Sequence, residues 1–247
     1  MSDETVMEQP TAGLSQVERV VDTFMAPTKT FEDIQRSASW WMPYVLSVLL
    51  GTLLMSAVVT KVGWQQLVDN TVQASPTLQS KLAALRPESM AQVRAEMISN
   101  FKVGLFGSPL FGLLLILVVA LVLWPTINFA FGGKAGFKQV FCMVNYAYLP
   151  LSLKGVIAAL MLYAGVAAEN FTLDNMLGTS VGYYVSTPGV LKTFLTQFDI
   201  FSVWVLVLMS IGLATIAGTK RSAGYITVVG WWFVVVLLTT VSKAVLG

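Results

Sequence analysis

The stretch PLFGLLLILVVALVLWPTINFAF, residues 109–131, contains no charged residue and is one of five long apolar stretches in this chain of 247 residues. The other four cover approximately residues 43–61, 140–167, 200–218 and 225–245. Each reaches or approaches the about 20 residues that a helix needs to cross the hydrocarbon core of a bilayer. Because lipid offers no hydrogen-bond partner to free backbone groups, helices are the expected form. The sequence therefore predicts an all-α, polytopic membrane helical bundle with five transmembrane helices.

The composition argues against soluble and catalytic classes of protein. Hydrophobic residues make up 55% of the chain and charged residues 11%, against about 25% charged residues in soluble domains. A net charge of +2 gives no support to a nucleic-acid partner. The chain has one cysteine, Cys142, and no histidine, so the usual histidine-based metal sites and general bases are absent. We therefore expect no enzyme activity, metal or cofactor, and we interpret Cys142 as a packing residue.

Two short connections set the predicted orientation. They cover residues 132–138 and 218–222 and carry only basic charges, at Lys134, Lys138, Lys220 and Arg221. Dense lysine and arginine in short loops mark the cytoplasmic side of a membrane protein. The total number of basic residues is equal on the two sides, but the basic residues on the other side are spread over longer segments. This density predicts a cytoplasmic N-terminus and a C-terminus outside.

The chain before the first span also has a pattern. We expect a disordered tail at residues 1–14, interfacial amphipathic helices on the cytoplasmic face at 15–40, and the membrane domain at 41–247. Ser15 and Glu18 form a capping-box pattern at a helix start. Apolar residues then follow at helical spacing, at Val17, Val20, Val21, Phe24 and Met25. Trp40 and Trp41 suit the headgroup level, and Pro43 suits the first turn of the span.

Two further segments carry prolines in informative places. In the outer connection, Ser75-Pro76 and Pro87-Glu88 predict two short amphipathic helices within about residues 75–101. They would either cap the outer ends of the spans or form a lid over a substrate path, and we favour the cap. In the third apolar stretch, Pro150 predicts a break, with an interfacial helix at about 137–147 that bends into the span.

Four polar residues lie in or beside the apolar stretches. A charge such as Lys154 costs about 2.5–3.5 kcal/mol on insertion scales. We expect Lys154 to extend to the inner interface rather than to have a functional or buried, paired role. We expect Asp199 to stabilise the start of the fourth span through the helix dipole rather than to pair with Lys154. Asn128 and Asn145 are expected to form hydrogen bonds between helices.

Several short motifs occur together in a recognisable order. Phe24, Pro27 and Phe31 precede an aromatic pair that ends at Trp41, and Pro43 follows. The turn GGKAGFKQ at 132–139, Tyr146 with Pro150, and FDIFSVWVLVLMSIGLATIAG at 198–218 come later. In order and spacing these residues resemble the Yip domain family, the Ypt/Rab-interacting membrane proteins, and particularly its bacterial branch. The resemblance covers nearly the whole chain after about residue 15.

The resemblance implies a five-span protein with a cytoplasmic N-terminus, and the bacterial branch implies the inner membrane. Eukaryotic members bind prenylated Rab-type GTPases and each other in vesicle traffic. The N-terminal segment here is shorter than in many of them, so we do not expect GTPase binding.

Two classes of function remain open. We favour a non-enzymatic membrane organiser or adaptor that binds other membrane proteins, further copies of itself or lipid. The alternative is a small permease or lipid-handling protein that uses the region around Lys154. Transporters often contain inverted repeats with interrupted helices in matching places, and five spans with one interruption do not show that pattern. Small residues recur every four positions at Ser210, Ala214 and Gly218, which favours close helix packing within the bundle or contacts between copies.

Overall fold

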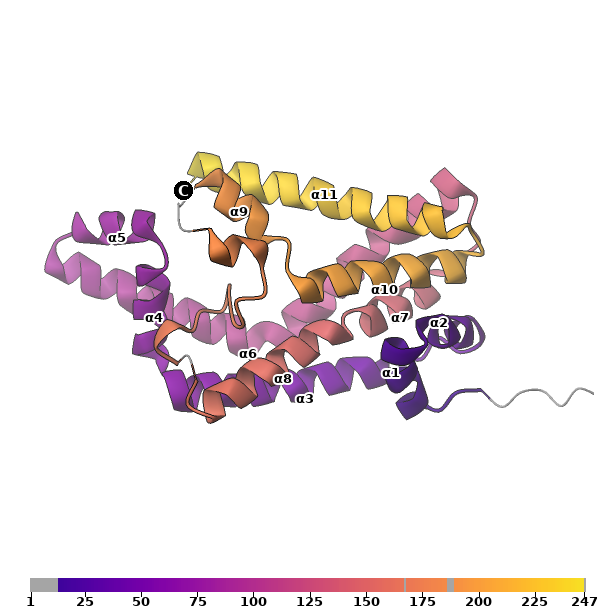
Figure 1. The fold of residues 1–247 in the computed structure, drawn as a ribbon, viewed down its shortest axis with the longest axis horizontal. Helices are drawn as coiled ribbons and strands as arrows, with labels where there is room; N and C mark the ends of the chain where they lie inside the picture. Colours follow the sequence, from indigo (N-terminus) through magenta and orange to yellow (C-terminus); the bar gives the residue numbers. More distant parts are fainter. Residues whose placement is uncertain (1–12, 167, 186–188, 247) are drawn as a thin grey trace, which may run out of the picture.

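The computed structural model describes residues 13–166, 168–185 and 189–246 and is an elongated bundle of helices (Figure 1). The predicted tail at residues 1–14 lies almost entirely outside the described residues. Within the described ranges the chain contains no β-sheet, only isolated bridges such as the one between Ser180 and Asp199. Five segments are long and apolar enough to cross a membrane: Trp41–Val62, Pro87–Ala130, Phe137–Tyr163, Ile200–Ala217 and Arg221–Ser242. The prediction of an all-α bundle with five spans is confirmed.

Most of the helices follow one another with short connections, but a long segment with two 3-10 turns separates α8 from α9. In chain order they are α1 (Gln16–Met25), α2 (Pro27–Arg36), α3 (Trp41–Ala57), α4 (Trp64–Gln73), α5 (Pro76–Ala83), α6 (Pro87–Pro125), α7 (Phe137–Ala147), α8 (Leu149–Tyr163), α9 (Val190–Thr196), α10 (Ile200–Ala217) and α11 (Arg221–Leu246). π-Helical turns extend α3 through Val58–Val62 and α6 through Thr126–Ala130. The predicted capping box is present at the start of α1, where Ser15 and Glu18 bond each other's backbone N–H groups.

The second span differs from the prediction. Instead of a short helix at Pro87 and a separate span from residue 109, α6 runs without interruption over 39 residues. Pro109 removes the N–H partner of the Leu105 carbonyl, but the Ser108 hydroxyl donates to that oxygen over 2.8 Å. The Tyr44 hydroxyl also donates to the Pro109 carbonyl over 3.3 Å. The Ser108 bond explains how the proline is accommodated, because it satisfies the carbonyl that Pro109 leaves without a backbone donor. The sequence analysis also missed α4, whose Leu67, Val68 and Val72 are buried.

The third span is interrupted as the sequence indicates. Helix α7 ends at Ala147, α8 begins at Leu149, and Pro150 occupies the first turn of α8, where its missing N–H costs little. Figure 1 shows α7 and α8 as two segments joined by a bend. The described span ends at Tyr163 rather than at the expected residue 167, which itself lies outside the described residues.

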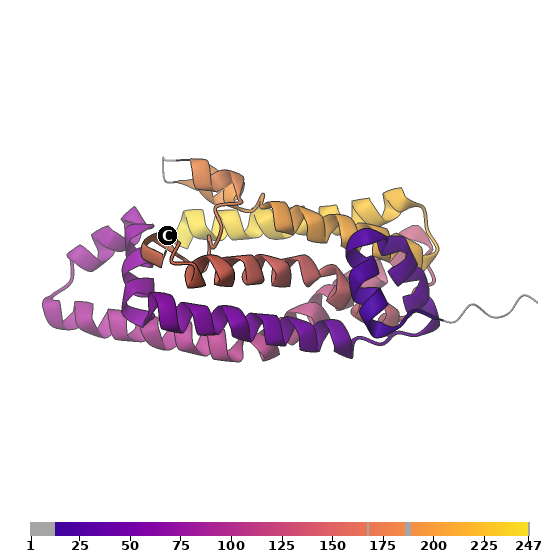
Figure 2. The same ribbon diagram turned by 60° about the horizontal axis from the view of Figure 1, so that its bottom comes forward.

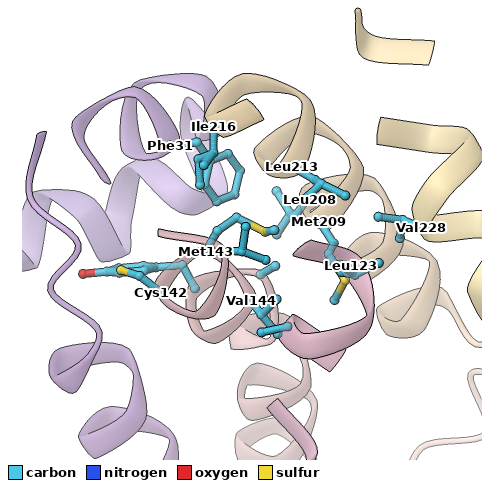
Figure 3. Packing of buried hydrophobic residues seen from close by; sticks show 14 of the residues in the cluster. Phe31, Leu123, Cys142, Met143, Val144, Leu208, Met209, Leu213, Ile216 and Val228 are labelled. Carbon is cyan, nitrogen blue, oxygen red and sulfur yellow. The ribbon is translucent and has the colours of Figure 1, made fainter. Parts of the chain in front are cut away.

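The main core lies where α2, α7 and α10 meet. Figure 3 shows Phe31 beside Ile216, with Met143 reaching the same region. This approach depends on Gly212, because a Cβ atom there would lie 2.6 Å from the Met143 side chain and 3.0 Å from the Phe31 ring. Phe31 is fully buried, so the helix pair α1–α2 is part of the folded bundle. Figure 2 shows α1 and α2 lying crosswise to the long axis of the spans, at one end of the bundle.

Small residues join α10 to α11. A Cβ atom at Gly224 would overlap the Ser210 carbonyl oxygen and would lie 3.0 Å from the Ala214 side chain. Gly218 ends α10 with a φ of +65°, a left-handed conformation that suits glycine. The repeat that contains Ser210 and Ala214 is therefore used inside the bundle.

Candidate functional site

The four polar residues singled out in the membrane domain fall into different places. Lys154 of α8 and Asp199 form an ion pair, with Lys154 Nζ 3.0 Å from Asp199 Oδ2. Their side chains are 17% and 7% exposed. The prediction that Lys154 extends to the inner interface is therefore wrong. Water is scarce inside the bundle, and there the Asp199 carboxylate supplies the counter-ion and hydrogen-bond acceptor that the Lys154 ammonium group needs.

Asp199 has two roles at once. Its Oδ1 caps α10 by accepting from the backbone N–H groups of Phe201 (3.0 Å) and Ser202 (3.3 Å). Its Oδ2 accepts from Lys154 and from the Thr179 hydroxyl. Asp199 was thus placed correctly at the helix start, but the expectation that it would not pair with Lys154 is wrong. The carboxylate joins α8, the start of α10 and the loop at Thr179 into one buried polar cluster.

A groove of about 440 Å³ lies between α3, α6 and α8. Small and hydroxyl-bearing residues line much of it, including Ser47, Gly51, Ser108, Gly112, Ser152 and Gly155. The Ser152 hydroxyl donates to the Ser47 hydroxyl over 2.9 Å across α8 and α3. Lys154 is not among the residues that line this groove. The charge therefore belongs to the contact between α8 and α10 and does not project into the groove.

The helix pair α1–α2 contains a second buried charge, which the sequence analysis missed. Arg19 is 1% exposed, and its Nε lies 2.5 Å from Asp33 Oδ2. Its Nη1 donates to the Ser37 carbonyl over 2.8 Å. Burial alone would raise the pKa of Asp33, but hydrogen bonds from Arg36 and Arg19 outweigh it and lower the pKa of this carboxyl. One signal in the sequence could have indicated this site. Arg19 and Thr23 are four residues apart, so they lie on the same face of the helix.

Polar side chains fix the helix pair to the end of the bundle. Gln35 donates to the Thr215 carbonyl of α10 over 2.7 Å, and Gln139 of α7 donates to the Gln35 carbonyl over 3.0 Å. The Tyr146 hydroxyl donates to Gln16 over 3.1 Å. Tyr146 is fully buried, although it lies 130 positions from its partner in the sequence.

The residues of the suspected family motifs lie mainly at the joints of this assembly. Pro27 begins α2, Phe31 enters the core, and Pro150 lies in the first turn of α8 after the bend. Pro43 is buried in the first turn of α3, whereas Trp41 is 52% exposed beside it. With Tyr146, these residues determine how the chain enters the first span and where the third span bends.

Asn128 and Asn145 do not bond between spans. Asn128 follows α6 and holds the turn after it, donating to the Ala135 carbonyl and accepting from the Ala135 N–H, both over 2.9 Å. Asn145 donates to Phe141 of its own helix over 2.8 Å, and its Oδ1 is buried without a hydrogen-bond partner in the structure. The expectation of interhelical bonds is wrong for both. A nearby backbone group was the closer partner in each case.

Asn128→Ala should lower the free energy of unfolding by about 1–3 kcal/mol, because it removes both hydrogen bonds to Ala135. Thermal unfolding in detergent micelles measures the effect. Asn100→Ala, at an exposed position on α6, is the matched control and should leave the midpoint unchanged. Equal midpoints for the two variants would contradict the role assigned to Asn128.

Among the described residues, no group of three or more histidine, cysteine, aspartate or glutamate side chains could hold a metal ion. Cys142 is fully buried within the core of α2, α7 and α10. The polar clusters of the described chain thus connect helices to one another and cap helix ends.

Comparison with known proteins agrees with this architecture. The family model of the Yip1 domain matches residues 21–242. The chain is also similar to "Membrane protein YknW" of Bacillus subtilis (strain 168), with 26% identity over 228 residues that cover 92% of this chain and 90% of that protein. This relative supports a place in the bacterial branch. No solved structure matches significantly. With a family match over almost its whole length and five candidate spans, the chain is a membrane protein and belongs to the Yip1 domain family.

Proposed function

We propose that this protein is a non-enzymatic organiser or adaptor of the bacterial inner membrane, which binds other integral membrane proteins through its cytoplasmic face. The observation that carries the proposal is the firmly docked helix pair α1–α2, which lies beside two basic turns at one end of the bundle (Figure 1). Such an arrangement provides a rigid surface that another protein can bind, and it suits binding better than catalysis.

The proposed binding surface consists of exposed basic residues from three segments. We call it the basic end, and it comprises Lys29 and Arg36 of α2, Lys134 and Lys138 around the start of α7, and Lys220 and Arg221 around the start of α11. Short loops rich in lysine and arginine stay on the cytoplasmic side, so the proposed orientation has the N-terminus inside and the C-terminus outside.

Charge complementarity indicates the chemistry of the partner. A positive surface beside the membrane attracts an acidic segment that leaves the membrane close by, and opposite charges speed such encounters. The proposed partner is therefore an integral membrane protein with an acidic cytoplasmic segment next to one of its spans. Gln35 and Gln139 fix α2 to α7 and α10, so little ordering is required when the partner binds.

The alternative of a permease that works through Lys154 is less favoured. A substrate-binding charge must be reachable from a path, whereas Lys154 is paired with Asp199 and does not line the groove between α3, α6 and α8. Its geometry suits a contact between helices.

Neutralising the basic end tests the proposal. In Lys29→Gln/Lys138→Gln/Lys220→Gln, cross-linking in native membranes should recover the partner at a several-fold lower yield than in the unchanged protein, because the charge attraction is lost. Arg86→Gln/Lys192→Gln, which removes charge elsewhere, is the control and should leave the yield unchanged.

Cysteine labelling of the 132–138 turn in intact cells checks that the orientation is the same in every variant. The proposal is wrong if the triple variant recovers the partner at full yield. It is also wrong if the unchanged protein cross-links to nothing except itself.

A further inference from the structure

Helix α1 buries two polar side chains and exposes three apolar ones, while its two other large apolar residues pack against the core. Its most buried residues are Arg19 and Thr23, at 1% and 0% exposure. Val17, Val21 and Met25, which recur every four positions, are 62%, 52% and 79% exposed. A surface helix facing water has the opposite arrangement, because burying apolar area is what stabilises its packing. The outer side of α1 is therefore built for an apolar environment.

The buried polar side chains of α1 form hydrogen bonds within the α1–α2 segment. The Thr23 and Thr30 hydroxyls both donate to the Arg19 carbonyl, over 2.7 and 3.0 Å. The Arg19 guanidinium bonds Asp33 and Ser37. These bonds fix the rotation of α1 about its own axis. Val17, Val21 and Met25 therefore face outward, and no other element of the described chain covers them.

Contacts with α10 place this apolar side at the depth of the membrane. Gln35 of α2 bonds Thr215 near the end of α10, whereas Phe24 of α1 packs edge-on against Trp204, with ring centroids 5.5 Å apart. Trp204 precedes Thr215 by eleven positions, which is about 16 Å along a helix. Since α10 is one of the five candidate spans, Phe24 of α1 contacts it within its membrane-spanning length and not beyond its end.

The spans near α1 also expose apolar side chains. Val203 and Val207 of α10, the near neighbours of Trp204, are 45% and 36% exposed. At the start of α3, Trp41 and Val45 are 52% and 42% exposed. Because the exposed apolar surface of a spanning helix meets acyl chains, an exposed apolar surface at the same depth meets them too.

We infer that α1 is embedded in one leaflet of the bilayer, with Val17, Val21 and Met25 in contact with lipid acyl chains. Its occupant is lipid and not a protein partner. The inference goes beyond the proposed adaptor function and does not depend on it. It also divides the helix pair, since α2 presents Lys29, Glu32 and Arg36 to the aqueous side while α1 faces the hydrocarbon.

Depth-dependent quenching tests this inference on the full chain in proteoliposomes. In a Cys142→Ala background, Val21→Cys and Met25→Cys each carry an environment-sensitive fluorophore. Glu32→Cys, on the exposed side of α2, is the aqueous control, and Val45→Cys, on α3, is the lipid control. An amphipathic helix buries its apolar face about 5–10 Å into the interface.

The labels at residues 21 and 25 should resemble the label at residue 45. They should be quenched by spin-labelled acyl chains, and iodide should quench them several-fold less than the label at residue 32. Iodide quenching equal to that at residue 32 would overturn the inference. Shielding from both quenchers would also overturn it, because it would mean that protein covers α1. Two separately labelled positions guard against a local effect of the label.

Discussion

Replacing Lys154 with methionine should lower the free energy of unfolding by about 3–5 kcal/mol, because it leaves a buried carboxylate without its counter-ion. Asp199 is 7% exposed at its side chain and cannot regain full hydration without opening the contact between α8 and α10. Unfolding in mixed detergent micelles, followed by the near-ultraviolet signal of the tryptophans, measures the loss.

A second substitution separates the charge from the packing. In Lys154→Met/Asp199→Asn the buried charge is removed, while asparagine retains an oxygen that can cap α10. This variant should recover most of the lost stability. Lys138→Met, at an exposed position, is the control for removing a lysine charge. If the single and double variants are equally unstable, the ion pair does not hold the two helices together.

Arg19→Met should separate α1 from α2, because the Arg19 side chain joins the two helices through Asp33 and Ser37. The side chains of Arg19 and Asp33 are 2% and 9% exposed, and removing one partner of such a buried pair costs about 3–5 kcal/mol. Trypsin cleavage after Lys29 and Arg36 in proteoliposomes should become much faster, while the spans remain protected.

Arg36→Met is the matched control for this prediction. Arg36 also binds Asp33, but its side chain is 57% exposed, so its loss should cost about 0–1 kcal/mol. Cleavage after Lys29 should then stay close to that of the unchanged protein. Comparable cleavage after Lys29 in the Arg19 and Arg36 variants would show that burial does not distinguish the two arginines.

The Asp33 carboxylate gives the contact between α1 and α2 a defined dependence on pH. The pKa of Asp33 is lowered in the folded protein, so its stabilising effect is complete above the ordinary pKa of an aspartate, about 3.9. That effect is lost only as the pH falls through the lowered value. Helices α1 and α2 should therefore stay joined at neutral and mildly acidic pH.

The sequence predicted those features that depend on neighbouring residues. Runs of apolar residues indicated the five spans, Pro150 indicated the bend, and Ser15 with Glu18 indicated the start of α1. Each of these signals acts within a few positions of the chain. The short basic turns were equally visible, because composition alone defines them.

The buried charges could not be predicted in the same way. Lys154 and Asp199 are 45 positions apart, and Arg19 and Asp33 are 14 apart, so their pairing depends on how the helices pack. The apolar pattern of α1 was visible, but not the fact that three of its residues would face outward. In the continuous helix α6, the Ser108 hydroxyl satisfies the Leu105 carbonyl that Pro109 leaves without a donor.

The length of α6 has a consequence for the side of the membrane that lies away from α1 and α2. A helix of 39 residues is about 58 Å long, roughly twice the thickness of the hydrocarbon core. Its first turns must therefore stand clear of the bilayer. There, Arg94 pairs with Asp69 of α4, and Leu82 of α5 packs against the same end. The continuous helix α6 therefore keeps α4 and α5 at a fixed distance from the lipid headgroups.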